Sequence, residues 1–242
     1  MHRRTFLARL GSAAMAAPLF TPLRSAEATV GSAPSFITRL QPAVVGGGFE
    51  LPDHWVWCGA PIRGEDGRYH LFASRIPKTV LFHPHWLFMS EIVRAESATP
   101  VGPYTLAEVA LPPRGGDFFD GRTTHNPHIR KVGDTYLLLY MGSTYDGPTP
   151  THDQQEVWRS PRYLATWARK RIGLATSKSV KGPWKRLDTP LLEPRPGEWD
   201  SIATTNPSLC PLPDGSFLLA YKSRKENLGN LQVGVARAPH YL

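Results

Sequence analysis

The chain has 242 residues, of which 28 are Lys or Arg and 20 are Asp or Glu, so its formal net charge is +8. The basic residues are scattered and form no run or recognisable nucleic-acid module, which argues against a nucleic-acid partner. Only Cys58 and Cys210 are cysteines, which excludes a disulfide-dense scaffold. We expect two buried free thiols, with a bridge outside the cytoplasm as the alternative.

Residues 1–28 are predicted to be an export signal. Arg3 and Arg4 precede a moderately apolar stretch, and the small residues at 26–28 suit a cleavage site. The order Arg-Arg-x-Phe-Leu is typical of twin-arginine signals. A mitochondrial-like leader and a membrane anchor are the alternatives, but the stretch is too short to span a bilayer. We therefore expect a periplasmic or secreted domain over residues 29–242, with no stable membrane insertion.

Three segments of the remaining chain repeat one order of strands and turns. In each segment the first strand begins near an x-Pro dipeptide, and a Gly-Asp or Asp-Gly turn leads from it to a second and a third strand. In the first two segments a Gly-Pro-aromatic tripeptide then leads into a fourth strand. The segments span residues 58–108, 125–188 and 205–241. Four antiparallel strands in a repeat predict an all-β propeller with about three blades. A β-sandwich is the alternative, but it would not repeat the same turn dipeptides in order.

One short helix is predicted over residues 160–171. It belongs to a connection at residues 144–169 that is far longer than a hairpin needs, and such connections often carry function. We expect this connection to lie over the mouth of the propeller.

Polar and aromatic residues stand where the strands should reach the mouth of a central funnel. In a propeller the start of the first strand of each blade, the end of the second and the start of the third converge there. The predicted ligand contacts are Trp57, Arg75, His125, Asn126, Arg171, Asn206 and Lys222. Alternatives remain open: the Asn residues could cap the blade backbone, the tryptophan could pack between blades, and the basic residues could bind an anionic sugar or pair with acids.

The blade pattern of residues 50–242 resembles the five-bladed β-propeller glycoside hydrolases of families 43 and 117. The resemblance implies catalytic carboxylates on the first strands of successive blades, commonly as Asp-Pro. The matching dipeptides here are Ala60-Pro61, Asn126-Pro127 and Asn206-Pro207. Asparagine can position a sugar hydroxyl but cannot exchange a proton near neutral pH, so the architecture matches the family and the acids do not.

Three other carboxylates are candidates for catalysis, because glycoside hydrolysis usually needs one carboxylic acid and one carboxylate. They are Glu91, Asp120 and Asp200. Asp120 and Asp200 recur at the same distance before their prolines, and a structural Asx-type turn in every blade is the alternative. Glu91 is specific to its blade, because Arg171 and Gln232 stand in the equivalent places.

These expectations describe an exported glycoside hydrolase-like protein that acts on poly- or oligosaccharides through carboxylates. A non-catalytic carbohydrate-binding propeller and a glycoside phosphorylase are the alternatives. No cofactor or metal site is predicted, although the resemblance allows a structural ion in the funnel. About three of the five implied blades are present, so we expect a truncated propeller that self-associates through open blade edges.

Overall fold

The computed structural model describes residues 35–153 and 155–240, so the predicted export signal lies outside the described residues. The chain divides into two units, Met1–Pro42 and Ala43–Leu242. The described part of the first unit holds helix α1 (Phe36–Arg39), whose N-cap Ser35 accepts a hydrogen bond from the amide of Thr38. None of the described helices is long and apolar enough to cross a membrane.

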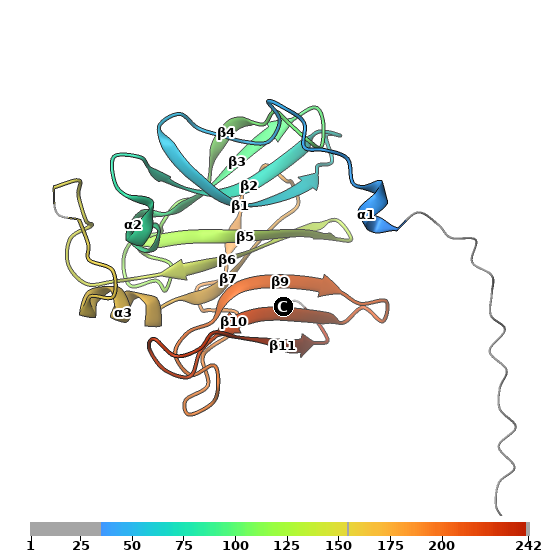
Figure 1. The fold of residues 1–242 in the computed structure, drawn as a ribbon. Coiled ribbons are helices and arrows are strands. Elements are labelled where there is room, and N and C mark those ends of the chain that lie inside the picture. Colours follow the sequence, from blue (N-terminus) through green and yellow to red (C-terminus); the bar gives the residue numbers. More distant parts are fainter. Residues whose placement is uncertain (1–34, 154, 241–242) are drawn as a thin grey trace, which may run out of the picture. The chain divides into compact units, whose positions relative to one another are not determined.

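The second unit contains three antiparallel sheets that follow one another along the chain (Figure 1). The strand order is β1-β2-β3-β4 in the first sheet, β5-β6-β7-β8 in the second and β9-β10-β11 in the third, within the described residues. The strands are β1 (His54–Arg63), β2 (Tyr69–Pro77), β3 (Glu91–Ser97), β4 (Thr105–Leu111), β5 (Thr123–Val132), β6 (Thr135–Ser143), β7 (Arg171–Ser177), β8 (Lys185–Arg186), β9 (Thr205–Pro211), β10 (Phe217–Ser223) and β11 (Gln232–Ala238). The predicted all-β blades, about three in number, are confirmed.

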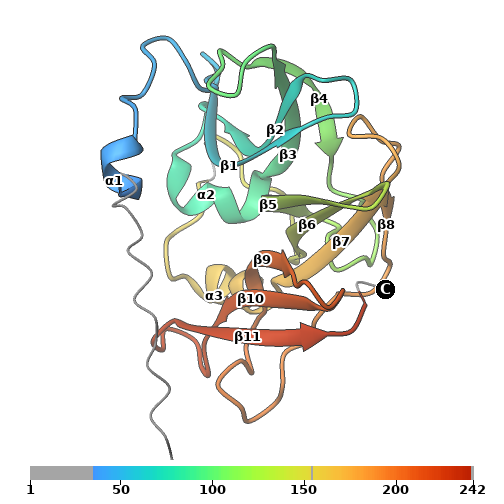
Figure 2. The same ribbon diagram turned by 90° about the vertical axis from the view of Figure 1, so that its right-hand side faces the viewer.

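The first strands of the three blades, β1, β5 and β9, lie side by side (Figures 1 and 2). Behind them, the second blade is covered on both faces, and every residue of β6 is buried. Its alternate side chains separate into two cores: Leu138 packs with Phe72 of the first blade, whereas Leu139 packs with Leu219 of the third. This explains why β6 is a continuous apolar run, since a strand with both faces covered has no polar side.

Each first strand carries a β-bulge whose residue has a left-handed backbone. Cys58, Asn126 and Asn206 have φ angles of 54°, 51° and 52°, and the strand register shifts at each of them. Asparagine tolerates this conformation better than most residues. The equivalent pairs are therefore Cys58-Gly59, Asn126-Pro127 and Asn206-Pro207, and the predicted alignment of Ala60-Pro61 with the Asn-Pro dipeptides is wrong by two residues.

Two helices lie at the same end of the blades, each in the connection before a third strand (Figure 1). Helix α3 (Pro161–Ala168) confirms the predicted helix, and Ser160 caps it by accepting a hydrogen bond from the amide of Tyr163. Helix α2 (Phe82–Met89) was not expected, because it is apolar on most sides and has no side-chain N-cap.

Both cysteines are free, as expected, but exposed rather than buried.

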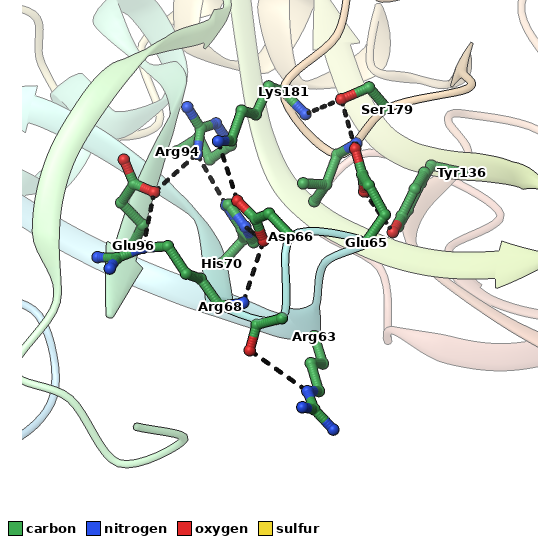
Figure 3. Close-up of polar contacts among 12 residues, drawn as sticks. Arg63, Glu65, Asp66, Arg68, His70, Arg94, Glu96, Tyr136, Ser179 and Lys181 are labelled. Carbon is green, nitrogen blue, oxygen red and sulfur yellow. Dashed lines mark hydrogen bonds and ion pairs between the residues drawn. The ribbon is translucent and has the colours of Figure 1, made fainter. Parts of the chain in front are cut away.

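Glu65, in a turn of the first blade, forms hydrogen bonds to the second blade (Figure 3). We call the contact of Glu65 with Tyr136, Ser179 and Val180 the clasp. The carboxylate of Glu65 accepts hydrogen bonds from the hydroxyls of Tyr136, at 2.8 Å, and Ser179, at 2.6 Å, and from the amide of Val180 at 3.2 Å. Partial burial acts to raise the pKa of Glu65, but these hydrogen bonds outweigh it and lower the pKa to about 2. The clasp therefore needs an ionised carboxylate.

Candidate functional site

A pocket of about 290 Å³ opens where the first strands of the three blades meet. Its walls come from the strands β1, β5, β6, β9 and β10, from both helices α2 and α3, and from the residues beside β7 and β11. It is lined by Trp57, Cys58, Phe82, Trp86, Asn126, Met141, Trp167, Lys170, Asn206, Lys222 and Leu231. Four of the predicted ligand contacts are therefore brought together: Trp57, Asn126, Asn206 and Lys222.

The two asparagines of the pocket have different hydrogen-bonding states. Asn126 has a partner at each end of its amide, because its Oδ1 accepts from Nε1 of Trp57 at 3.1 Å and its Nδ2 lies 3.4 Å from the sulfur of Met141. The Oδ1 of Asn206 and the carbonyl oxygen of Lys222 both lie 3.0 Å from the hydroxyl of Thr205, which has one proton to donate. The Nδ2 of Asn206 has no partner among the described residues, so Asn206 can donate a hydrogen bond to a ligand, while Asn126 holds an aromatic wall in place.

Three tryptophans and Phe82 form the aromatic part of the wall. Trp57 meets Phe82 edge to face, with ring centroids 5.0 Å apart. Trp86, from α2, packs against the ring of His125 at 5.4 Å. Trp167, from α3, lies under the ammonium of Lys170, with 3.8 Å between Nζ and the ring centroid. The wall therefore offers large apolar surfaces whose positions are fixed by neighbouring groups.

Positive charge borders the same pocket. Burial lowers the pKa of the Lys170 ammonium well below its usual value, and the nearby Lys222 and Arg224 lower it further. Burial also lowers the pKa of Lys222, although Cys58 opposes that change. Although Cys58 is exposed, partial desolvation at the pocket raises the pKa of its thiol, and Lys222 opposes that change. Within the described residues, no carboxylate lines the pocket.

Asp120 is completely buried inside the second blade. Its carboxylate accepts hydrogen bonds from Nε of Arg114 at 2.7 Å, from the hydroxyl of Tyr140 at 2.8 Å and from Arg186 at 3.2 Å. Burial, followed by the charge of Asp120, raises the pKa of Tyr140. The carboxylate thus joins a loop to the blade and does not line the pocket.

Asp200 repeats this arrangement in the third blade. It is completely buried, and it accepts from Nε of Arg195 at 3.1 Å and from the hydroxyl of Tyr221 at 2.7 Å. Burial and the hydrogen bond to Asp200 raise the pKa of Tyr221 to about 12. The recurrence of Asp120 and Asp200 therefore has a structural explanation, in which an ion pair with arginine takes the place of the expected Asx-type turn. Their catalytic role stays a prediction.

Glu91 is held on the opposite face of the first blade from the pocket. Its carboxylate accepts from Nε and Nη2 of Arg75 at 2.9 and 2.7 Å, and the two residues are partners across β2 and β3. Ser74 instead accepts a hydrogen bond from the amide of Asn126. Because neighbouring residues of a strand point to opposite faces, Arg75 and Glu91 lie on the side of the sheet that faces away from Asn126.

The remaining predicted contacts have partners within the protein. His125 is completely buried, and its Nδ1 lies 3.1 Å from the hydroxyl of Ser90. Burial, assisted by Lys170, lowers the pKa of His125 to about 3, so the ring is neutral. Arg171 bonds to Glu193 at 3.0 Å. His125 thus supports the pocket from behind, through its contact with Trp86, and Arg171 does not line it.

Asp66, His70 and Glu96 form the one His-carboxylate cluster of the described residues with the spacing of a metal site (Figure 3). An arginine cannot accept a hydrogen bond, so Nη1 of Arg94, at 2.8 Å, must donate to Nδ1 of His70. Nε2 of His70 then donates to Asp66 at 3.0 Å. The cluster is already satisfied by groups of the chain.

The carboxylates of this cluster also have cationic partners of their own. Lys181 lies 2.9 Å from Asp66, and Arg68 lies 3.2 Å from Glu96. In the main pocket, the ammonium groups of Lys170 and Lys222 do not suit a metal cation either. A structural ion is therefore not supported at either place.

Sequence reasoning missed Lys170, Trp86 and Trp167, as well as Phe82, Met141 and Leu231. Lys170 stands directly before Arg171, and the cross-strand pairs Arg75–Glu91, Gly142–Arg171 and Ser223–Gln232 are equivalent. Glu91, Arg171 and Gln232 are therefore equivalent, and so are the residues directly before them, which are Ser90, Lys170 and Leu231. The strand was located correctly, but the residue chosen from it was on the wrong face.

No protein-family model and no curated protein matches the chain. Among solved structures, Zg3597, a family 117 glycoside hydrolase produced by the marine bacterium Zobellia galactanivorans, has a TM-score of 0.59 at 18% identity, covering 77% of this chain and 53% of that one. A thermostable family-43 glycoside hydrolase has a TM-score of 0.50 at 17% identity, covering 75% and 54%. A third structure, of a glycoside hydrolase, has a TM-score of 0.55 at 17% identity, covering 78% and 56%.

The chain thus spans a little more than half of the length of each of these structures. Such glycoside hydrolases are five-bladed β-propellers, and the predicted resemblance is confirmed at the level of fold. The chain therefore has the β-propeller fold of family 117 and family 43 glycoside hydrolase structures, with its pocket at the meeting point of three first strands.

Proposed function

We propose that the pocket binds a carbohydrate. The observation that supports this most directly is the convergence of Trp57, Trp86 and Trp167 on one pocket together with the free amide of Asn206. A sugar ring has apolar C–H faces and an edge of hydroxyls, so flat aromatic walls combined with a few placed polar groups suit it. The fold shared with glycoside hydrolases is consistent with this function.

Titration of the full chain with oligosaccharides, followed by calorimetry and tryptophan fluorescence, tests the proposal. Trp57→Phe and Trp86→Phe should each weaken binding several-fold, because they reduce the stacking area. Trp184→Phe is the matched control: this tryptophan packs on Phe72 between the blades, with ring centroids 5.5 Å apart, and does not line the pocket. Absence of binding to every sugar of the panel would contradict the proposal.

Glycoside hydrolysis by carboxylates is the second candidate. It is supported by the fold, and Glu91 is the predicted carboxylate with some exposure, at 26% of its side chain. Product analysis of glycoside digests with Glu91→Gln, Asp120→Asn and Asp200→Asn tests it. Turnover that persists in folded forms of all three variants would remove these residues from catalysis, and binding without any turnover would favour the first candidate.

We propose that residues 1–28 direct export, which separation of cell fractions would test. Replacing Arg3 and Arg4 together by lysine should retain the protein in the cytoplasm if the twin-arginine pathway carries it.

We also propose that the chain associates with a second copy through an open blade edge.

A further inference from the structure

Three cationic side chains, Lys170, Lys222 and Arg224, gather at one wall of the pocket; we call them the cation cluster. Lys170 comes directly before β7, and Lys222 and Arg224 stand at the end of β10. Lys170 and Lys222 line the pocket. Arg224 lies behind it, with its guanidinium carbon 3.4 Å from the ring centroid of Trp167.

The cluster lacks a negative partner. In the described part of the chain, none of its three members forms an ion pair with Asp or Glu, although fourteen pairs of Lys or Arg with Asp or Glu occur elsewhere, from Arg68–Glu96 to Arg237–Asp214. The charged neighbours that act on Lys170 are the other two cations of the cluster. Burial and both neighbours therefore disfavour the charged form of Lys170, and no carboxylate of the described chain stabilises that form.

Burial makes this arrangement costly. Lys170 is 2% exposed and Arg224 is 8% exposed, and Nε of Arg224 is a buried donor with no hydrogen-bond partner in the described residues. The faces of Trp86 and Trp167 give some attraction to the ammonium of Lys170. A buried charge nevertheless needs a paired acceptor to offset its lost hydration, and the pocket is the place from which one can reach Lys170.

We propose that the carbohydrate taken by this pocket carries an anionic group, which binds between Lys170 and Lys222. The inference rests on the proposed carbohydrate function and specifies its ligand class. A hexuronate carboxylate supplies such a group as part of the sugar. A sulfate ester or a phosphate carries the same charge, so the experiment must distinguish these sources.

The experiment measures the affinity of the full chain for four probes by calorimetry. They are a hexuronate oligosaccharide, its uncharged methyl ester, a sulfated oligosaccharide of similar size, and inorganic phosphate alone. The acid should bind about tenfold or more tightly than its ester, because only the carboxylate can form a charge-assisted hydrogen bond with a lysine ammonium of the cluster. Added salt should reduce this preference only weakly, since the pair is largely shielded from solvent.

Three variants assign the effect to the cluster. Lys170→Met and Lys222→Met should each remove most of the preference for the acid, measured as the ratio of the affinities for acid and ester. Lys185→Met, which changes an exposed lysine of β8 outside the pocket, should keep the full preference. If Lys170→Met does not fold, the half-buried Lys222 still provides the test, and Lys222→Arg should restore part of the preference.

The outcomes separate the two proposals. Equal binding of acid and ester would overturn the anionic ligand and leave carbohydrate binding in place. A strong preference for the sulfated sugar would support the anion and identify a sulfate ester as its source. Tight binding of phosphate, with no sugar bound better, would support the anion site and contradict carbohydrate binding. Binding of none of the probes would overturn both.

Discussion

Cys58 occupies a backbone conformation that suits its residue type poorly. Its φ of 54° is shared with the equivalent Asn126 and Asn206, and a left-handed backbone strains most side chains that have a Cβ. Cys58→Asn should therefore raise the free energy of unfolding by up to about 1 kcal/mol. Urea denaturation measures this change. Cys210→Asn is the control, because Cys210 is exposed in β9 and is absent from the positive-φ residues, and it should give no gain.

Asp120 tests whether a repeated carboxylate is structural. Asp120→Asn removes the charge from a buried group that Arg114 and Arg186 both contact, and the free energy of unfolding should fall by about 3–5 kcal/mol. Asp188→Asn removes another partner of Arg114, at 2.8 Å, but its side chain is 79% exposed, so the loss should be less than about 1 kcal/mol. Similar losses in the two variants would show that Asp120 is not a structural anchor.

The sequence predicts where the strands lie, but it does not predict which face of a strand points to the pocket. The repeated turns located the first, second and third strands of each blade, and they also led to Asn126 and Asn206. They did not reveal which of two consecutive residues in a strand points to the pocket, as the prediction of Arg171 in place of Lys170 shows. A shift of one residue reverses the face of a strand, and the bulge at Cys58 shifted the first blade by two residues.

The helices illustrate a related limit. Helix α3 has a serine N-cap, a proline in its first turn and one apolar face, which are readable signals. Helix α2 lacks a side-chain N-cap and is apolar on most sides, so its sequence carries few of the signals that predict a helix. Trp86 and Trp167 enter the pocket only because these helices fold over its mouth, which explains why both were missed.

The clasp between the first two blades should make stability depend on pH. The pKa of Glu65 is about 2 in the folded chain, against an ordinary value of 4.5, so the unfolded chain binds the proton more readily. The clasp therefore contributes fully above pH 4.5, and its contribution is lost as the pH falls from 4.5 to about 2.

Urea unfolding at a series of pH values checks this expectation. Glu65→Gln should flatten the acid side of the stability profile, by on the order of 1 kcal/mol or less because Glu65 is partly exposed. Ser179→Ala, which removes one donor to Glu65, should give a profile between those of Glu65→Gln and the parent chain. A profile that neither variant changes would show that Glu65 does not carry the acid sensitivity.

For the molecule as a whole, the sequence was sufficient for the blade architecture because each blade is specified locally. Its turns and apolar strands recur in order, and the core lies between neighbouring copies, as Leu138 and Leu139 show by packing on opposite sides. The pocket is different, because its members come from all three blades. Lys170, Lys222 and Trp57 are far apart in the chain, and their proximity depends on how the blades pack.

The third blade offers a surface for association with a second copy. Strand β11 pairs with β10 on one side, and within the described residues its other edge is unpaired. Val233 and Val235 point to one face of this strand and are 74% and 63% exposed. An unpaired antiparallel edge with exposed apolar side chains can add another strand by backbone hydrogen bonding. We therefore expect the 242-residue chain to dimerise at micromolar concentration through antiparallel pairing of β11.

Sedimentation velocity over a range of concentrations tests this association. Replacing Val233 and Val235 by lysine should shift the chain towards the monomer, because charge on an edge strand opposes pairing and like charges would face each other across the new contact. Val157→Lys is the control, since Val157 is 67% exposed but lies in the connection before α3. A parent chain that stays monomeric throughout would contradict edge pairing, and a dimer that both sets of substitutions leave intact would place the contact on another surface.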